Sequence, residues 1–233
     1  MHHPSAIKRQ LTLIQLADSF FPSGGYTLSH GLESLIQHNK IHNPESISSF
    51  LQILLQQKIA TCDLVALIYA FNASAADNIG QIQYIAARLH AQTLIATSRK
   101  TQLQSGRALL MVAQSTWQHP QLEILDRQRA LNQFYSLHPV VFGVVGNIAG
   151  LTETETAIAF LHGFVTGVLG AAIRLGKLGH IQAQQLLLAL AADIEQASDA
   201  ASAMELEDMW SCTPTIDIAQ MRHNKLDSKL FAN

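Results

Sequence analysis

The stretch TETETAIAFLHGFVTGVL, residues Thr152 to Leu169, decides the fold more than any other part of the chain. Thr152, followed by Glu155 three residues later, forms a capping box, which marks the first turn of an α-helix. The large apolar residues that follow lie at helical spacing: Phe160, Leu161, Phe164, Val165, Val168 and Leu169. We expect this helix to lie at the centre of a helical core.

Helical periodicity extends outward from this stretch in both directions. Asn43 before Pro44 is a typical N-cap with proline at the first helical position. The apolar positions after it predict an amphipathic helix: Ile47, Phe50, Leu51, Leu54, Leu55 and Ile59. Further helices are expected at 7–17, 28–37, 62–75, 79–99, 102–117, 122–136 and 182–197.

Strand-like alternation is nearly absent from the sequence. The valines between Val140 and Val145 favour a helix opened by Pro139, because no partner strand is visible elsewhere. We find no linker and no internal repeat. The sequence therefore predicts an all-α fold, a single bundle-like domain of about ten helices spanning residues 1–233.

The two ends of the chain show a weaker helical pattern than its middle. Residues 1–10 are predicted to be a flexible N-terminal segment. After Trp210 the helical rhythm is lost, and Pro214 opens a tail, residues 214–233, in which large apolar residues alternate with basic ones. If this tail does not fold back on the body, it is a peptide that needs a groove in a partner.

Bulk composition narrows the class of function. Hydrophobic residues make up 48% of the chain and charged residues only 14%, which indicates either a large buried fraction or a surface covered by a partner. The net charge of −2 and the scattered basic residues argue against nucleic-acid binding. Cys62 and Cys212 have no C-x-x-C spacing and no signal-like segment is seen, so a reduced cytoplasmic protein is expected.

Two apolar runs need to be weighed as membrane spans. Val140 to Leu151 is too short to cross a bilayer, and Ala157 to Ile173 is marginal and carries His162 near its centre. Both are better interpreted as buried helices, and we expect no membrane partner.

The loop DSFFPSGGYTLSHGLE, residues 18–33, concentrates unusual chemistry between two helical patterns. Pro22 fixes φ, Gly24 and Gly25 permit positive φ, and serines lie beside aromatic residues. No G-K-[ST] follows, so the loop is not a P-loop. A tight turn with serine capping is the simplest interpretation, and a protein contact is compatible with it.

An enzyme is the alternative from another class. Asp18, Ser19 and His30 would be the working residues of a small helical hydrolase or metal-dependent enzyme, but adjacency in sequence supplies neither an oxyanion hole nor an oriented base. The eleven histidines are isolated or lie in loops rather than at ligand spacing. The sequence therefore predicts no catalytic, cofactor-binding or metal-binding residues.

Several segments resemble one known family. The loop words D-S-F-F-P-S-G-G-Y and S-x-G-L-E resemble the N-terminal signature of the urease accessory protein UreF family. Arg174-Leu175-Gly176-Lys177-Leu178-Gly179 is similar to its R-L-G-x-x-G turn, and Ile216 to His223 with Ser228 to Phe231 resembles its C-terminal tail. His138 to Gly143 is a weaker match. The segments occur in the expected order over nearly the whole chain.

The resemblance implies a non-catalytic, all-helical and dimeric protein. Members of this family join UreD, also called UreH, and the GTPase UreG to mature apo-urease with nickel, and a modulation of GTP hydrolysis by UreG is proposed for them. Carried over by position, the partner-binding residues are Ser23, Gly24, Gly25, Tyr26, Ser29, His30, Glu33, Asp217, Met221, Arg222, His223, Ser228, Lys229, Leu230 and Phe231. Lys229 departs from the arginine common in the family, and lysine cannot reproduce a bidentate guanidinium contact.

Overall fold

A computed structural model describes residues 5–18, 21, 28–223, 225–226 and 228–232, and every element in that part of the chain is a helix. The prediction of an all-α fold is confirmed. In chain order the elements are α1 (Ala6–Ala17), α2 (Leu32–Gln37), α3 (Pro44–Leu54), η2 (Leu55–Asp63), α4 (Leu64–Ala75), α5 (Ile79–Gln92), α6 (Ala96–Trp117), α7 (Pro120–Ala130), α8 (His138–Ile148), α9 (Glu153–Arg174), α10 (His180–Ala189), α11 (Ala191–Ser202), η3 (Leu206–Asp208) and α12 (Pro214–His223).

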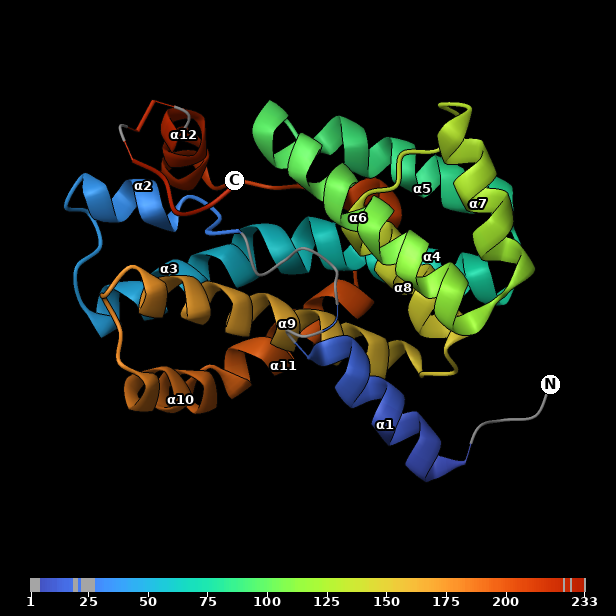
Figure 1. The fold of residues 1–233 in the computed structure, drawn as a ribbon, viewed down its shortest axis with the longest axis horizontal. Coiled ribbons are helices and arrows are strands. Elements are labelled where there is room, and N and C mark those ends of the chain that lie inside the picture. The colour runs from blue at the N-terminus through green and yellow to red at the C-terminus, as the bar shows by residue number, and fades with distance from the viewer. Residues whose placement is uncertain (1–4, 19–20, 22–27, 224, 227, 233) are drawn as a thin grey trace.

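The core is built around α8, which packs against α4 and α6 (Figure 1). Pro139 stands in the first turn of α8, as its sequence predicts. Gly143 allows α8 to touch the backbone of α4, because an added Cβ would lie only 2.2 Å from the carbonyl oxygen of Leu67. Gly146 makes the same kind of close contact with the side chain of Thr156 on α9. Small residues thus set the spacing of the central helices.

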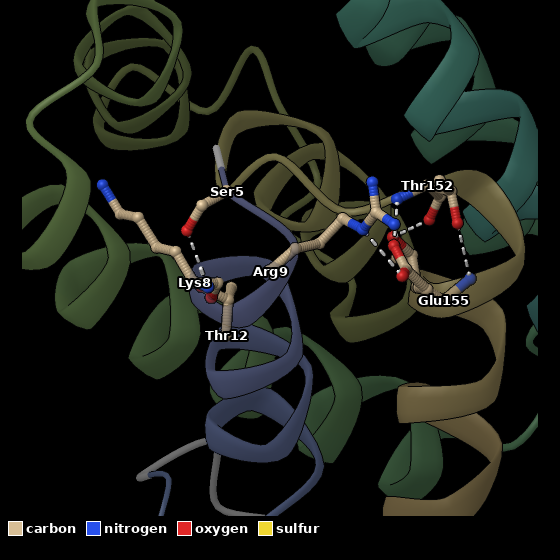
Figure 2. A network of polar contacts seen from close by, with 7 residues as sticks. Ser5, Lys8, Arg9, Thr12, Thr152 and Glu155 are labelled. Carbon is tan, nitrogen blue, oxygen red and sulfur yellow. Dashed lines mark hydrogen bonds and ion pairs between the residues drawn. The ribbon is translucent and has the colours of Figure 1, made fainter. Parts of the chain in front are cut away.

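The capping box of α9 is present and also anchors α1. The Thr152 hydroxyl accepts a hydrogen bond from the Glu155 amide at 3.1 Å, and the Glu155 carboxylate accepts one from the Thr152 amide at 2.8 Å. Figure 2 shows Arg9 of α1 reaching the same carboxylate, with Nε 2.9 Å from Oε1. Ser5 caps α1, which begins at Ala6, within the segment that the sequence predicts to be flexible.

Helices α3 and α4 form one continuous helical stretch through η2, a nine-residue π-helix that the sequence does not reveal. A π segment of this length is rare and widens the helix locally. Two of its carbonyl groups accept hydrogen bonds from a distant part of the chain: Trp210 N donates to Thr61 O at 3.0 Å, and Cys212 N donates to Gln57 O at 2.9 Å. The segment before α12 is thereby fixed to the core.

Other helix boundaries differ from the sequence prediction for local reasons. The helix expected over 79–99 ends at Gln92, where the Thr93 hydroxyl donates to Leu89 O at 2.8 Å. The helix expected over 182–197 is divided at Leu190 into α10 and α11. The helix expected from Leu28 begins only at Leu32.

Two helical stretches, Pro44–Ala75 and Glu153–Arg174, are long and apolar enough by length and composition to span a membrane. Of their most apolar windows, however, 72% and 56% of the residues are buried inside the structure. Core helices pass the same test, so the apolar character of both stretches is accounted for largely by packing.

Candidate functional site

The tail does not behave as a free peptide, because residues 214–223 form helix α12, which packs on α2 (Figure 1). The loss of helical rhythm predicted after Trp210 is therefore wrong for this segment. The reason is chemical: α12 buries Ile216, Ala219, Gln220 and His223 at helical spacing, and two of these four are polar. We call α2, α12 and residues 225–226 and 228–232 the terminal unit.

A buried carboxylate joins the parts of the terminal unit. Glu33 of α2 lies 190 residues from His223, and its Oε2 is 2.7 Å from His223 Nε2, with side chains 1% and 2% exposed. The other carboxylate oxygen, Oε1, accepts a hydrogen bond from the amide of Leu230 at 2.7 Å. One side chain thus holds both the end of α12 and the chain beyond it.

The hydrogen-bond partner of His223 indicates which ring nitrogen donates. Nε2 faces a carboxylate and therefore carries a proton, whereas the buried Nδ1 has no hydrogen-bond partner among the described residues. The geometry thus favours an Nε2–H donor on His223, bonded to the carboxylate of Glu33.

The entry to α2 requires a glycine. Gly31 has φ of 90°, and an added Cβ would lie 3.1 Å from Gln220 Cγ and 3.2 Å from the carbonyl oxygen of Ile216. The Gln220 amide donates to the carbonyl oxygen of His30 at 3.3 Å, and its own carbonyl accepts from the Ser98 hydroxyl. Backbone and side-chain contacts of α12 therefore fix the loop that leads into α2.

A third segment, the turn after α9, reaches the same place. Gly176 has φ of 68° and closes α9, with hydrogen bonds from Gly176 N to Ile173 O and from Lys177 N to Ala172 O. The guanidinium carbon of Arg174 lies 4.5 Å from the centre of the Phe231 ring, which is 6% exposed. The N-terminal, R-L-G and C-terminal segments singled out in the sequence thus meet in one unit.

The predicted partner-binding residues divide into two groups by burial. Ser29, Glu33, His223 and Phe231 are buried and stabilise the terminal unit, while His30 and Asp217 are partly buried. Asp217 accepts a hydrogen bond from the Thr213 hydroxyl at 3.0 Å. The exposed group consists of Met221, Arg222, Ser228, Lys229 and Leu230. Ser23, Gly24, Gly25 and Tyr26 lie outside the described residues.

The predicted partner-binding residues omit three contributors to this unit. Gln220 fixes the loop before α2, and the Gln37 amide donates to the carbonyl oxygen of Ser228 at 3.1 Å. Ile218 is 49% exposed and lies three and four residues before Met221 and Arg222, so it shares their helix face. Only the helical spacing of Ile218, Met221 and Arg222 could have been detected in the sequence, and only if α12 had been recognised as a helix.

The hydrolase alternative gains no support from the surroundings of His30. Burial, followed by the nearby Lys58 and His138, lowers the pKa of His30 to about 4. Its ring meets Phe164 edge-on, with centroids 4.9 Å apart. A general base of a triad is oriented by a carboxylate, whereas the groups that shift this pKa are basic side chains. Ser19 lies outside the described residues.

A metal centre is likewise not formed by the residues that the structure describes. Within them, no group of three or more His, Cys, Asp or Glu side chains is arranged to hold a metal ion. Two titratable side chains instead have neighbours of another kind: the partly buried His138 lies against Phe142 and Phe160, and the buried Asp63 accepts a hydrogen bond from Gln102.

Comparison with known proteins gives a consistent result. The family model described as UreF matches residues 41–191 of this chain. The chain is 54% identical to the urease accessory protein UreF of Trichodesmium erythraeum (strain IMS101), covering 98% of this chain and 99% of that protein. It is 30% identical to urease accessory protein UreF 1 of Brucella melitensis biotype 1, covering 96% and 92%. It is 27% identical to that of Actinobacillus pleuropneumoniae serotype 3, covering 94% and 96%.

Proposed function

We propose that this chain, which belongs to the UreF family of urease accessory proteins, is a non-catalytic scaffold in the maturation of apo-urease. In this proposal it bridges UreD/UreH and the GTPase UreG, and the assembled complex delivers nickel to the apo-enzyme. The partners are those that the family resemblance implies. The protein would act in the cytoplasm as a homodimer.

The observation that carries the proposal is the contrast between the two sides of α12. Its inner side is held by the buried Glu33–His223 contact, whereas Ile218, Met221 and Leu230 of the unit are 49%, 57% and 70% exposed. Arg222 is exposed beside them. Apolar side chains next to an arginine on a rigid support are the composition of a protein-binding surface, in which arginine supplies directional bonds and apolar area supplies affinity.

In the proposed mechanism, the terminal unit receives UreD/UreH. Because α2 and α12 are already joined in the free chain, binding would pay less ordering entropy than the docking of a disordered peptide. UreG would bind a surface of the dimer, where the scaffold would couple nickel release to the nucleotide state and modulate GTP hydrolysis.

The proposal is tested by changing only the exposed side chains. We expect the double variant Ile218→Asp/Met221→Asp to lose UreD/UreH binding by about a hundredfold or more, because two charges would be buried against apolar partner atoms. Binding is measured by calorimetry, and the mass of the complex by light scattering coupled to size exclusion. Addition of UreG then tests the larger assembly.

Leu188→Asp is the matched control, because Leu188 is 79% exposed on α10, away from the terminal unit. It should leave UreD/UreH binding unchanged. Wild-type affinity in the double variant, or equal losses in both variants, would remove the terminal unit from the proposed interface. Failure of the wild-type chain to bind UreD/UreH at micromolar concentration would contradict the scaffold function itself.

A further inference from the structure

A cavity of about 1000 Å³ lies among α1, η2, α6, α8 and α9, and its lining also includes His30, just before α2, and Gln220 on the inner side of α12. Its walls are mainly apolar: buried Phe142 and Phe160 line its interior, and Ile14 and Ile158, which are 62% and 44% exposed, line it where it meets the surface. Its volume is at the upper end of the range typical of small-molecule sites.

One lysine on the wall of this cavity has no hydrogen-bond or ion-pair partner among the described residues. Lys58 projects from the π-helix η2 and is half-buried. Among the described residues it forms no hydrogen bond, and no carboxylate oxygen lies within the 4.0 Å of an ion pair from its ammonium. Other unpaired lysines, such as Lys100 on α6, are exposed to water, which solvates their charge.

Two carboxyl groups, those of Asp18 and Asp63, also line the cavity, and the charge of Lys58 lowers the pKa of Asp63 against the larger effect of burial. Asp63 is 3% exposed, and its carboxyl group is engaged by Gln102, with Nε2 3.0 Å from Oδ1. Burial raises the pKa of Asp63 and lowers the pKa values of His30 and His138 to about 4, so both imidazoles are neutral at pH 7. The cavity thus combines apolar walls with a half-buried cation that forms no hydrogen bond or ion pair with a described residue.

We propose that this cavity binds a small anionic amphiphile, an apolar chain that ends in a carboxylate, of the fatty-acid class. The carboxylate pairs with Lys58, and the apolar chain lies along α9 between Phe160 and Gly170. A charge-assisted hydrogen bond in surroundings of low polarity is stronger than the same bond in water, so the head group contributes to affinity as well as to orientation. The proposal does not depend on the scaffold function, although the cavity shares His30 and Gln220 with the surroundings of the terminal unit.

The test uses three probes that differ only in the head group: dodecanoate, dodecanol and dodecylammonium, each below its micellar concentration. With the full-length chain, calorimetry should show dodecanoate binding with one-to-one stoichiometry. Dodecanol should bind about tenfold more weakly, and dodecylammonium more weakly still. Native mass spectrometry checks the stoichiometry.

Two variants separate the head-group contact from the apolar chain. Lys58→Met should weaken dodecanoate about tenfold and leave dodecanol unchanged, because the methionine keeps the apolar stem. Gly170→Leu should weaken both probes, since a Cβ at Gly170 meets no atom within 4 Å and a side chain there enters the open space. Lys100→Met is the control for general charge and should bind like the wild type. If Lys58→Met does not fold, Lys58→Gln replaces it.

Several results would overturn the proposal. Equal affinity for dodecanoate and dodecanol, or an unchanged affinity in Lys58→Met, would show that Lys58 does not recognise an anion. Non-saturating binding of many equivalents would indicate adsorption to exposed apolar residues. If dodecanoate fails to bind, but Lys58→Met lowers the mass of a self-associated or partner complex, the cavity is a protein interface and not a small-molecule site.

Discussion

The centre of the molecule and its terminal unit are held together by different physical means. Around α8 the helices meet through apolar side chains and close backbone contacts, as at Gly143 against Leu67. In the terminal unit, segments 190 residues apart meet through one buried carboxylate, Glu33. Apolar burial is spread over many atoms, whereas a polar joint depends on a few. The centre should therefore fail by overpacking, and the terminal unit by loss of single hydrogen bonds.

The largest expected effect is at the centre. Gly143→Ala places a Cβ 2.2 Å from the carbonyl oxygen of Leu67, so α4 and α8 must move apart. We expect a loss of about 3 kcal/mol in the free energy of unfolding, measured by urea denaturation. Gly170→Ala is the control, because its Cβ meets nothing within 4 Å, and it should be neutral or stabilise by up to about 1 kcal/mol. Equal stability of the two variants would show that the centre is not close-packed there.

The second effect breaks the polar joint. Glu33→Ala leaves His223 and the amide of Leu230 without their acceptor, which should cost about 2 to 3 kcal/mol. Hydrogen exchange should increase in α12 and around residues 228–232, while α8 stays protected. Glu33→Gln, which keeps the shape and one acceptor, should fall between the wild type and Glu33→Ala. If hydrogen exchange increased equally in α8, the terminal unit would not open independently of the centre of the molecule.

The third prediction concerns the pH dependence of stability, which should come from His138 of α8, at the centre of the molecule. The pKa of the partly buried His138 is lowered from 6.5 to about 4, so between these pH values the unfolded chain binds a proton that the folded chain does not bind. The free energy of unfolding should thus decrease as the pH is lowered from 6.5 to 4, with a slope approaching about 1.4 kcal/mol per pH unit for this histidine. His30 acts in the same direction, and Asp63, with its raised pKa, opposes both. His138→Gln should reduce the slope in urea titrations at several pH values, and an unchanged slope would rule out His138 as a source.

The smallest effect is expected where an aromatic ring meets a cation. Phe231→Leu keeps an apolar side chain beside Arg174 but removes the ring that lies under the guanidinium. The expected cost is about 1 kcal/mol, with faster exchange confined to the last described residues. A cost as large as that of Glu33→Ala would show that the ring, and not the carboxylate, is the main support of the tail.

The same division explains how much of the molecule could be predicted from the sequence. The capping box at Thr152 and the N-cap at Asn43 are where their local signals predict them, because a helix start is set by neighbouring residues. Helix α12 was not recognised, since its buried face includes Gln220 and His223, whose burial depends on partners far away in sequence. The π-helix η2 was missed for a similar reason, because its carbonyl partners come from residues 210 and 212.

The candidate site was predicted in part. The resemblance identified the segments that form the terminal unit, but sequence alone could not distinguish a buried residue such as His223 from an exposed one such as Met221. That distinction depends on which side of α12 faces α2. Since α12 is not marked by apolar periodicity, its orientation had no local signal.

The attachment of Trp210 and Cys212 to η2 also limits how long α12 could stay dissociated from α2. Cys212 is fixed to Gln57 only two residues before α12 begins at Pro214. If α12 dissociated, it would therefore remain tethered close to its binding surface on α2, at an effective concentration on the order of millimolar. Dissociation of α12 from α2 would therefore be short-lived. A competing ligand would have to bind α2 faster than the tethered α12 rebinds.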